Sequence, residues 1–197
     1  MTNALIVIDV QNDFCPGGAL AVPEGDVIVP AINAMMDRFD AVILTQDWHP
    51  TGHSSFASSH DGKAPFDTVQ MPYGVQVLWP DHCVQGSTGA AFHSDLRTDA
   101  DLIIRKGFRS AVDSYSAFFE NDQTTPTGLE GYLRTRGITK LTMVGLATDF
   151  CVNFSALDAA RLGFDVSVDL SACRAIDMDG SLQAALDAMR NAGVNLI

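Results

Sequence analysis

The sequence predicts an α/β fold, a three-layer sandwich whose middle layer is a six-stranded parallel sheet. Six short apolar runs recur along the chain, and each run is nearly continuous instead of alternating with polar residues. Strands that are covered by helices on both faces show this pattern. Segments with helical patterns lie between the runs, and such an alternation of strand and helix is typical of a parallel sheet.

The individual elements follow from these runs and from the residues that end them. The predicted strands span residues 5–8, 41–44, 102–104, 141–144, 166–170 and 194–197. The predicted helices span residues 27–36, 128–137, 150–162 and 179–193. The last three helices end at Gly137, Gly163 and Gly193, as expected for glycine in a left-handed C-cap.

Residues 47–100 interrupt this alternation. They are rich in Gly, Pro, His and Ser, and they contain both tryptophans and all five histidines of the chain. A long stretch without periodicity inside a compact domain is usually either functional or disordered. We therefore expect a single domain over residues 1–197, with an ordered insertion at about 47–100 that forms part of an active site.

Charge and composition exclude several classes of partner. The net charge of −12 argues against nucleic acid and anionic membranes, because a phosphate surface attracts clustered Lys and Arg. No apolar run approaches the roughly 20 residues of a membrane span, and the start "MTNALIVIDV" lacks the basic region of a signal peptide. The four cysteines form no Cys-x-x-Cys pair. We expect a reduced, cytoplasmic protein.

Four side chains with catalytic potential follow predicted strands. Asp9, Asp47, Lys106 and Cys151 all come directly or closely after an apolar run, and ligands bind at the carboxyl ends of parallel strands. Each residue alone has an ordinary explanation, as a packing cysteine, a solvated lysine or a turn aspartate. Their shared placement instead favours a nucleophile site without a histidine base, in which Asp9 accepts the proton of Cys151.

The surroundings of Cys151 are expected to favour its thiolate form. If Thr148 or Asp149 caps the following helix, Cys151 lies in the first turn, where the helix dipole stabilises an anion. A nearby ammonium group, here that of Lys106, would lower the thiol pKa further.

A second group of residues has the composition of a metal site. "DWHPTGHSSF" carries Asp47, His49 and His53, and the later "WPDHC" carries His82. One carboxylate with imidazoles suits Zn²⁺, Fe²⁺ or Mn²⁺. The alternative is a polar loop whose histidines bond to the backbone. If these residues bind a metal, the insertion at about 47–100 is the metal-binding part of the active site.

Five stretches resemble the bacterial nicotinamidase (pyrazinamidase) family, which belongs to the isochorismatase-like hydrolases. They occur in matching order over residues 5–177, nearly the whole chain, and each is long and specific. The stretches are "VIDVQNDFCPGGAL", "TQDWHPTGHSSFAS", "WPDHCVQGSTGAAFH", "DSYSAFF" and "VGLATDFCV".

The resemblance implies a role for each matching residue. The catalytic triad of the family falls on Asp9, Lys106 and Cys151, and its fold is isochorismatase-like. One divalent ion, zinc before iron or manganese, would bind Asp47, His49 and His82. His53 matches a histidine that is a ligand in only some members.

The resemblance also describes the pocket. The peptide bond between Leu146 and Ala147 is expected to be cis, and the amides of Ala147 and Cys151 to form an oxyanion hole. Phe150 departs from the family, because many relatives carry His there, and we expect it to alter packing and not the reaction. The aromatic positions that line the pocket fall on Phe14, Trp79 and Tyr115.

These expectations describe an amidase that converts nicotinamide to nicotinate and ammonia through a cysteine thioester, in NAD salvage, and that also accepts pyrazinamide. One alternative is a relative that acts on a carbamoyl or ureido compound; such relatives generally lack the metal residues. Isochorismatases proper lack the cysteine nucleophile. Another alternative is a non-catalytic metal-binding protein, which would be expected to lose a triad residue. The sequence does not determine which metal binds or whether the chain forms a homo-oligomer.

Overall fold

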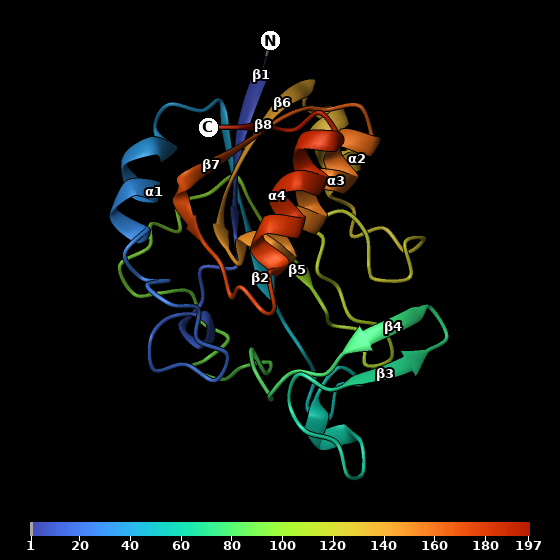
Figure 1. Cartoon of the computed structure of the whole chain (residues 1–197). Helices are drawn as coiled ribbons and strands as arrows, with labels where there is room; N and C mark the ends of the chain where they lie inside the picture. The colour runs from blue at the N-terminus through green and yellow to red at the C-terminus, as the bar shows by residue number, and fades with distance from the viewer. Residues whose placement is uncertain (1) are drawn as a thin grey trace.

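Six parallel strands form the central sheet, as predicted. The computed structural model describes residues 2–197 and arranges the strands in the order β5-β2-β1-β6-β7-β8 (Figure 1). All neighbouring pairs run parallel. The strands are β1 (Thr2–Ile8), β2 (Ala41–Asp47), β5 (Leu102–Lys106), β6 (Ile138–Leu146), β7 (Asp165–Arg174) and β8 (Asn195–Leu196).

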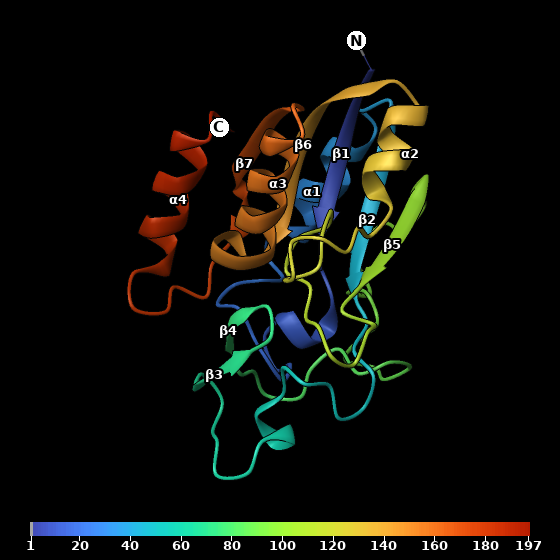
Figure 2. The same ribbon diagram turned by 90° about the vertical axis from the view of Figure 1, so that its right-hand side faces the viewer.

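Helices cover both faces of the sheet, which confirms the three layers. Alternate residues of β1 point to opposite sides, so Ile6 packs in one hydrophobic cluster and Leu5 in the other. The first cluster includes residues of α2 (Leu129–Thr135), α3 (Asn153–Arg161) and α4 (Ser181–Asn191), and the second includes residues of α1 (Val29–Met36). Figure 2 shows α1 behind the sheet and α2 and α3 in front of it.

The glycines that end the last three helices agree with the sequence, whereas the helices begin one to three residues later than predicted. Gly137, Gly163 and Gly193 all have the left-handed φ expected of a C-cap. Helix α1 begins at Val29, later than predicted, with a proline in its first turn. A start at residue 27 would place Pro30 deeper in the helix, where its missing N–H would cost a hydrogen bond.

Much of the segment between β2 and β5 lies beyond the carboxyl ends of the strands in both ribbon views, and its last residues return beside α1. It contains an antiparallel hairpin, β3 (Thr68–Met71) and β4 (Gly74–Val77), which the sequence did not predict. Its strands have only four residues each and lie in a polar region, so their short apolar alternation was not distinguishable from a loop. The hairpin extends the wall above the sheet edge.

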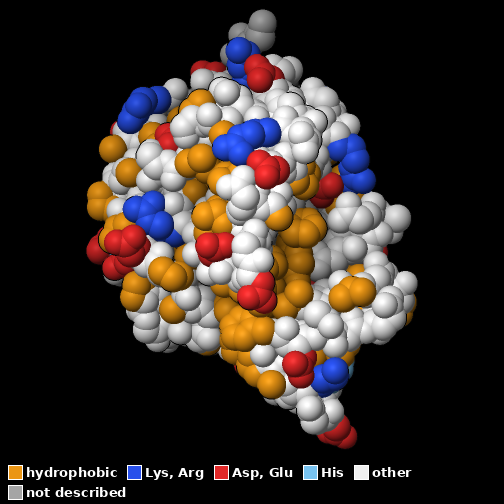
Figure 3. Space-filling model, in the orientation of Figure 1, with side chains coloured by type: hydrophobic (Ala, Val, Ile, Leu, Met, Phe, Trp, Pro, Cys, Tyr) orange, Lys and Arg blue, Asp and Glu red, His pale blue; other side chains and the backbone are white. Residues whose placement is uncertain are grey.

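Hydrophobic side chains gather on the face that carries α4 (Figure 3). A shallow groove beside this helix is lined by Leu170, Leu182 and Leu186, among others. None of the predicted site residues lines this groove, so it lies outside the candidate active site. Among residues 2–197, no helix combines the length and the apolar character that crossing a membrane requires.

Candidate active site

The strand order brings the four strand-end residues together. Lys106 and Asp47 are the last residues of β5 and β2, Asp9 follows β1, and Cys151 follows β6. These four strands are consecutive neighbours in the sheet, so their carboxyl ends form one continuous edge. The predicted nucleophile site is therefore assembled from adjacent strands.

Lys106 lies at the centre of this group. Its Nζ atom is 2.8 Å from Asp9 Oδ2 and 3.4 Å from Cys151 Sγ, and it also bonds Asp47 Oδ1. The carbonyl oxygen of Ser114 accepts a further bond of 3.0 Å from the same atom. Burial opposes the charge, but Asp47 and Asp9 hold the pKa of Lys106 well above its ordinary value. Lys106 is a buried cation between two carboxylates.

Asp9 is held so that its carboxylate faces the thiol. The Thr45 hydroxyl donates to Asp9 Oδ1 at 2.6 Å, and the Asp9 amide donates to Thr45 Oγ1 at 3.1 Å. One side-chain atom each of Asp9, Asp47 and Cys151 lie within 4.8 Å of one another. Burial raises the pKa of Asp9 although Lys106 opposes the shift, and a raised pKa suits a group that must accept a proton.

A close strand approach places Cys151 beside Asp9. Gly145 in β6 has a φ of +118°, and a Cβ atom there would lie 2.1 Å from the carbonyl oxygen of Ile8. Only glycine allows β6 to pass so near the end of β1. The peptide bond between Leu146 and Ala147 is cis, as the resemblance implied.

The helix after β6 does not begin as expected. Thr148–Val152 forms a π-helical turn that leads into α3, and neither Thr148 nor Asp149 makes a side-chain cap. The Asp149 carboxylate instead accepts hydrogen bonds from the amides of Ile176 and Asp177, at 3.1 and 2.8 Å. The capping prediction was wrong because this carboxylate bonds to the chain segment before α4.

The surroundings of the Cys151 thiol also differ from the expectation. Burial raises the pKa of the thiol well above its ordinary value; Lys106 lowers it, but Asp9 and Asp47 add to the rise. The cation that was expected to stabilise a thiolate is shared with two carboxylates. Burial and the two carboxylates therefore shift the thiol pKa in the direction opposite to the one expected from the helix start and Lys106.

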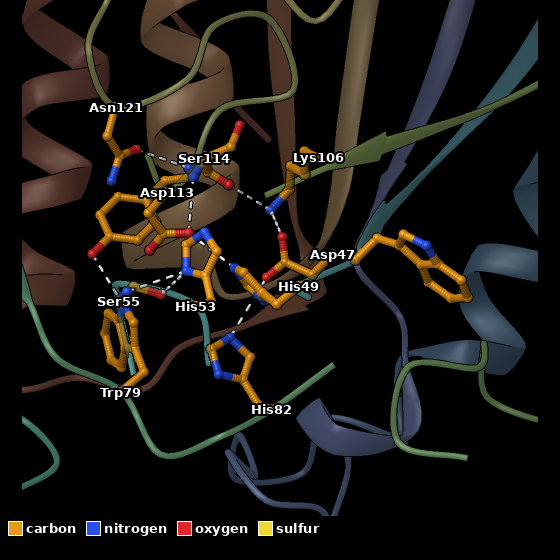
Figure 4. A network of polar contacts seen from close by, with 12 residues as sticks. Asp47, His49, His53, Ser55, Trp79, His82, Lys106, Asp113, Ser114 and Asn121 are labelled. Atoms are coloured by element: carbon orange, nitrogen blue, oxygen red, sulfur yellow. Dashed lines mark hydrogen bonds and ion pairs between the residues drawn. The ribbon is translucent and has the colours of Figure 1, made fainter. Parts of the chain in front are cut away.

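The three predicted metal ligands converge. One ligand atom each of Asp47, His49 and His82 lie within 4.8 Å of one another, and Figure 4 shows Asp47 between Lys106 and His82. His82 Nδ1 is 2.8 Å from the carbonyl oxygen of Pro80, which leaves its Nε2 atom 3.7 Å from Asp47 Oδ2. His49 Nδ1 is buried and has no hydrogen-bond partner among residues 2–197. Two imidazoles with an available nitrogen and one carboxylate fit a divalent metal.

His53 lies beside this set, but its nitrogens are engaged. Its Nε2 atom is 2.8 Å from the carbonyl oxygen of Arg109, and its Nδ1 atom is 2.8 Å from Ser55 Oγ. A carbonyl only accepts, so Nε2 carries the hydrogen and Nδ1 accepts from the hydroxyl. In this arrangement no free lone pair of His53 faces the other ligands.

One pocket joins the two groups. It is lined by Cys151, Ala147 and His82. Phe150 stands in the aromatic wall, with its ring centroid 5.0 Å from that of Trp79 and 5.8 Å from that of Tyr115, in edge-to-face contact. All three predicted aromatic positions, Phe14, Trp79 and Tyr115, line the same pocket.

Sequence reasoning missed two polar residues of the site. Asp113 lines the pocket and lies 3.0 Å from His49 Nε2 (Figure 4), and the buried Gln76 bonds to Asp113 from the hairpin. Asp113 stands in the quoted stretch "DSYSAFF", but its spacing from the histidines carries no ligand signal. Gln76 could not have been found without the hairpin.

Comparisons with known proteins agree with this geometry. The isochorismatase domain model matches residues 3–197. A nicotinamidase from Acinetobacter baylyi is 58% identical over 98% of this chain and 91% of its own length. The structure of an Acinetobacter baumanii nicotinamidase and pyrazinamidase has a TM-score of 0.98 at 55% identity, covering 100% and 95% of the two chains. A Pyrococcus horikoshii pyrazinamidase in complex with zinc has a TM-score of 0.80 at 36% identity, covering 100% and 99%.

Proposed function

The chain belongs to the isochorismatase family, and we propose that it hydrolyses nicotinamide to nicotinate and ammonia, with pyrazinamide as a further substrate. The observation that carries the proposal is a single pocket lined both by Cys151 and by His82 of the metal set. Nicotinamide offers a carboxamide to the thiol and a ring nitrogen to a metal. The two Acinetobacter relatives described above are both named as nicotinamidases, and one of them also as a pyrazinamidase. The reaction returns nicotinate for NAD salvage.

Acylation uses the three residues around Lys106. Cys151 Sγ attacks the carboxamide carbon while its proton passes to Asp9, and the carbonyl oxygen becomes anionic. Asp9 then gives that proton to the nitrogen, the C–N bond breaks and ammonia leaves. Lys106, 3.4 Å from the sulfur, stabilises the negative charge while it is transferred. The product of this half-reaction is a nicotinoyl thioester on Cys151.

The oxyanion is bound by the backbone amides of Ala147 and Cys151, and both residues line the pocket. Each such donor contributes about 3 kcal/mol in comparable sites. Hydrolysis then repeats the sequence with water: Asp9 takes a proton from the water, hydroxide attacks the thioester carbon, and the C–S bond breaks as the proton returns to sulfur. The product leaves as nicotinic acid, which becomes nicotinate by releasing its own proton to the released ammonia or to solvent. Atoms and charges balance without another co-reactant.

Asp47, His49 and His82 would hold one divalent ion, zinc before iron or manganese. When bound, the ion supplies a Lewis-acid contact for the ring nitrogen and so orients the substrate. The aromatic rings of Phe14, Trp79 and Tyr115 bind the flat substrate ring. We do not include His53 in the ligand set, because both its nitrogens already have partners.

The proposal needs only residues 1–197 as one hydrolase domain, with residues 47–100 supplying the metal set. Every residue named in the reaction belongs to one chain, so no second copy is required, whether or not a homo-oligomer forms. All four cysteines are free, which fits a reducing cytoplasm. A relative acting on carbamoyl or ureido compounds remains the second candidate, but the convergence of Asp47, His49 and His82 disfavours it.

Ammonia release tests the proposal. We expect the zinc-loaded protein to release ammonia from nicotinamide and pyrazinamide, and to act poorly on a non-aromatic amide and on a carbamoyl compound. Metal content is measured on the same sample. Turnover of the carbamoyl compound in preference to nicotinamide would support the second candidate, and bound metal without any ammonia release would indicate a non-catalytic protein.

A further inference from the structure

We propose that Asp113 is a positioning residue that fixes the tautomer and orientation of the metal ligand His49, and that Gln76 holds Asp113 in place for this role. The inference rests on the metal site of the proposed function. Neither residue touches the reacting atoms of the substrate in the mechanism above. Both act through other side chains.

The contact between Asp113 and His49 decides which imidazole nitrogen is available. Asp113 Oδ1 lies 3.0 Å from His49 Nε2, and both side chains are buried. The carboxylate can only accept, so the hydrogen of a neutral imidazole sits on Nε2 and the lone pair on Nδ1. His49 Nδ1 is also the buried atom without a hydrogen-bond partner among residues 2–197. The carboxylate thus presents the unpartnered nitrogen as a ligand.

Asp113 is itself held from three directions. The Ser114 amide donates to Asp113 Oδ1 at 2.8 Å, and the Asn121 amide donates to the Asp113 carbonyl oxygen at 2.8 Å. Gln76 Nε2 donates to the second carboxylate oxygen, Oδ2, at 3.1 Å. The carboxylate therefore has little freedom to turn away from His49.

The neighbours of Gln76 settle the orientation of its amide. Asn121 Nδ2 and the Tyr73 hydroxyl donate to Gln76 Oε1, at 3.1 and 3.2 Å. The Nε2 group must then face acceptors, and its two N–H bonds are shared among three of them: the Val77 carbonyl oxygen at 2.7 Å, the Tyr115 hydroxyl at 2.8 Å and Asp113 Oδ2 at 3.1 Å. The Trp79 Nε1 group donates to the same hydroxyl at 3.1 Å.

One buried amide therefore connects two parts of the site. Gln76 is 1% exposed and is carried by β4 of the hairpin outside the main sheet. Through Asp113 it reaches the metal ligand His49, and through Tyr115 it reaches the aromatic wall of the pocket. This gives the hairpin a function: it fixes the metal set relative to the ring that the pocket binds.

Two substitutions of Asp113 test the first half of the inference. Asp113→Asn leaves a single acceptor oxygen for the three donors of His49, Ser114 and Gln76, and Asp113→Leu leaves none. We expect zinc to bind about 10-fold to 100-fold more weakly, with the larger loss in the leucine variant. The zinc dissociation constant is measured by competition with a coloured chelator.

A second readout follows the imidazole directly. Nitrogen NMR of the zinc-free protein should show His49 protonated on Nε2 in the wild type and shifted toward the Nδ1-protonated form in Asp113→Leu. The rate at which Cys151 reacts with a small alkylating agent should change by less than about twofold, because Lys106 and Asp9 keep their contacts. A merely structural role for Asp113 would not shift the tautomer.

Gln76→Leu tests the second half, and Gln70→Leu is its matched control. Gln70 lies on the other strand of the same hairpin but is exposed, and its side chain bonds only to the carbonyl oxygen of Met71 among residues 2–197. We expect Gln76→Leu to weaken zinc binding several-fold and to raise KM for nicotinamide more than it lowers kcat. Gln70→Leu should match the wild type in both measurements.

The possible results distinguish a failure of the roles inferred for Asp113 and Gln76 from a failure of the proposed metal site. If zinc binding is equally tight in Asp113→Leu and the wild type, and His49 keeps its tautomer, the positioning role is overturned. If Asp47→Ala binds zinc as tightly as the wild type, the proposed metal site is wrong instead, and the tautomer measurement on zinc-free protein still decides the role of Asp113. Equal effects of Gln76→Leu and Gln70→Leu would overturn the role of Gln76.

Discussion

Lys106 is the residue at which the nucleophile and the metal set meet. Its ammonium group contacts Asp9 and Cys151 on one side and Asp47 on the other. A buried cation is tolerated only with such partners, and removal of one partner of a buried pair costs about 3–5 kcal/mol. Removal of Lys106 would therefore leave two buried carboxylates uncompensated, and its contacts connect the thiol to Asp47.

The thiol of Cys151 lies beside Lys106, and this position distinguishes Cys151 from the other three cysteines. Burial raises the pKa of Cys15 to about 11 and that of Cys173 to about 12, with no lysine in contact. We expect Cys151→Ala to abolish nicotinamide hydrolysis, and the alanine variants of Cys15, Cys83 and Cys173 to keep most of it. The measurement is kcat/KM for ammonia release from each variant.

A thioester mass on Cys151, trapped with a slowly hydrolysed substrate, would support the covalent route. Hydrolysis that survived in Cys151→Ala would rule that route out. Thermal unfolding of each variant separates a loss of chemistry from a loss of folded protein, because all four cysteines are buried.

At the scale of elements, the turn that carries Cys151 is tied to the chain segment before α4. Asp149 accepts bonds from the amides of Ile176 and Asp177 and from the Ser181 hydroxyl. Asp149→Ala would leave these donors without their acceptor, so we expect a loss of about 2–3 kcal/mol in the free energy of unfolding. Urea unfolding measures it.

Asp187→Ala is the matched control for this loss. Asp187 lies on α4 and is exposed, and its contact is an i,i+3 ion pair with Arg190. Such surface pairs contribute about 0.5 kcal/mol or less. If the two variants lost the same stability, the turn would not depend on Asp149.

The strands were predictable and the hairpin was not, for the same physical reason. Strands β1, β2 and most of β6 are buried on both faces and leave continuous apolar runs, and the partly exposed edge strands β5 and β8 keep shorter ones. All six runs became neighbours in one sheet. Strands β3 and β4 are half exposed and short, so their composition differs little from that of a loop. Gln76 was missed together with the hairpin that carries it.

The sequence predicted which residues form the candidate site better than it predicted their electrostatics. Asp9, Asp47 and Lys106 could be placed because parallel strands share one carboxyl edge. The pKa of the Cys151 thiol is shifted opposite to the sequence-based expectation, because a sequence does not show burial, or that Lys106 is shared by two carboxylates. Asp113 acts through His49, and no spacing rule links a ligand to the residue that orients it.

At the scale of the whole molecule, the sheet edge supplies the reacting groups and the segment above it supplies recognition. Asp9 and Cys151 follow sheet strands and Lys106 ends one, whereas His49, His82 and Trp79 lie between β2 and β5. One pocket is lined from both parts. This division predicts that attack on the amide and orientation of the ring can be impaired separately.

Benzamide separates the two functions, because it has the carboxamide of nicotinamide but lacks the ring nitrogen. If metal binding orients the ring, His49→Ala should lower kcat/KM for nicotinamide by about 10²-fold, since a misplacement of about 1 Å can cost that much. Benzamide should already be a poor substrate of the wild type, and the same substitution should lower its kcat/KM little further. Chelation of the wild type should reproduce this pattern.

The alkylation rate of Cys151 is the control for damage to the nucleophile, and it should stay near the wild-type value in His49→Ala and in the chelated enzyme. Equal proportional losses of kcat/KM for nicotinamide and benzamide would falsify the role of the ring nitrogen. The metal set would then act on structure or on water, because both amides present the same group to Cys151 and differ only at the ring position that the metal is proposed to bind.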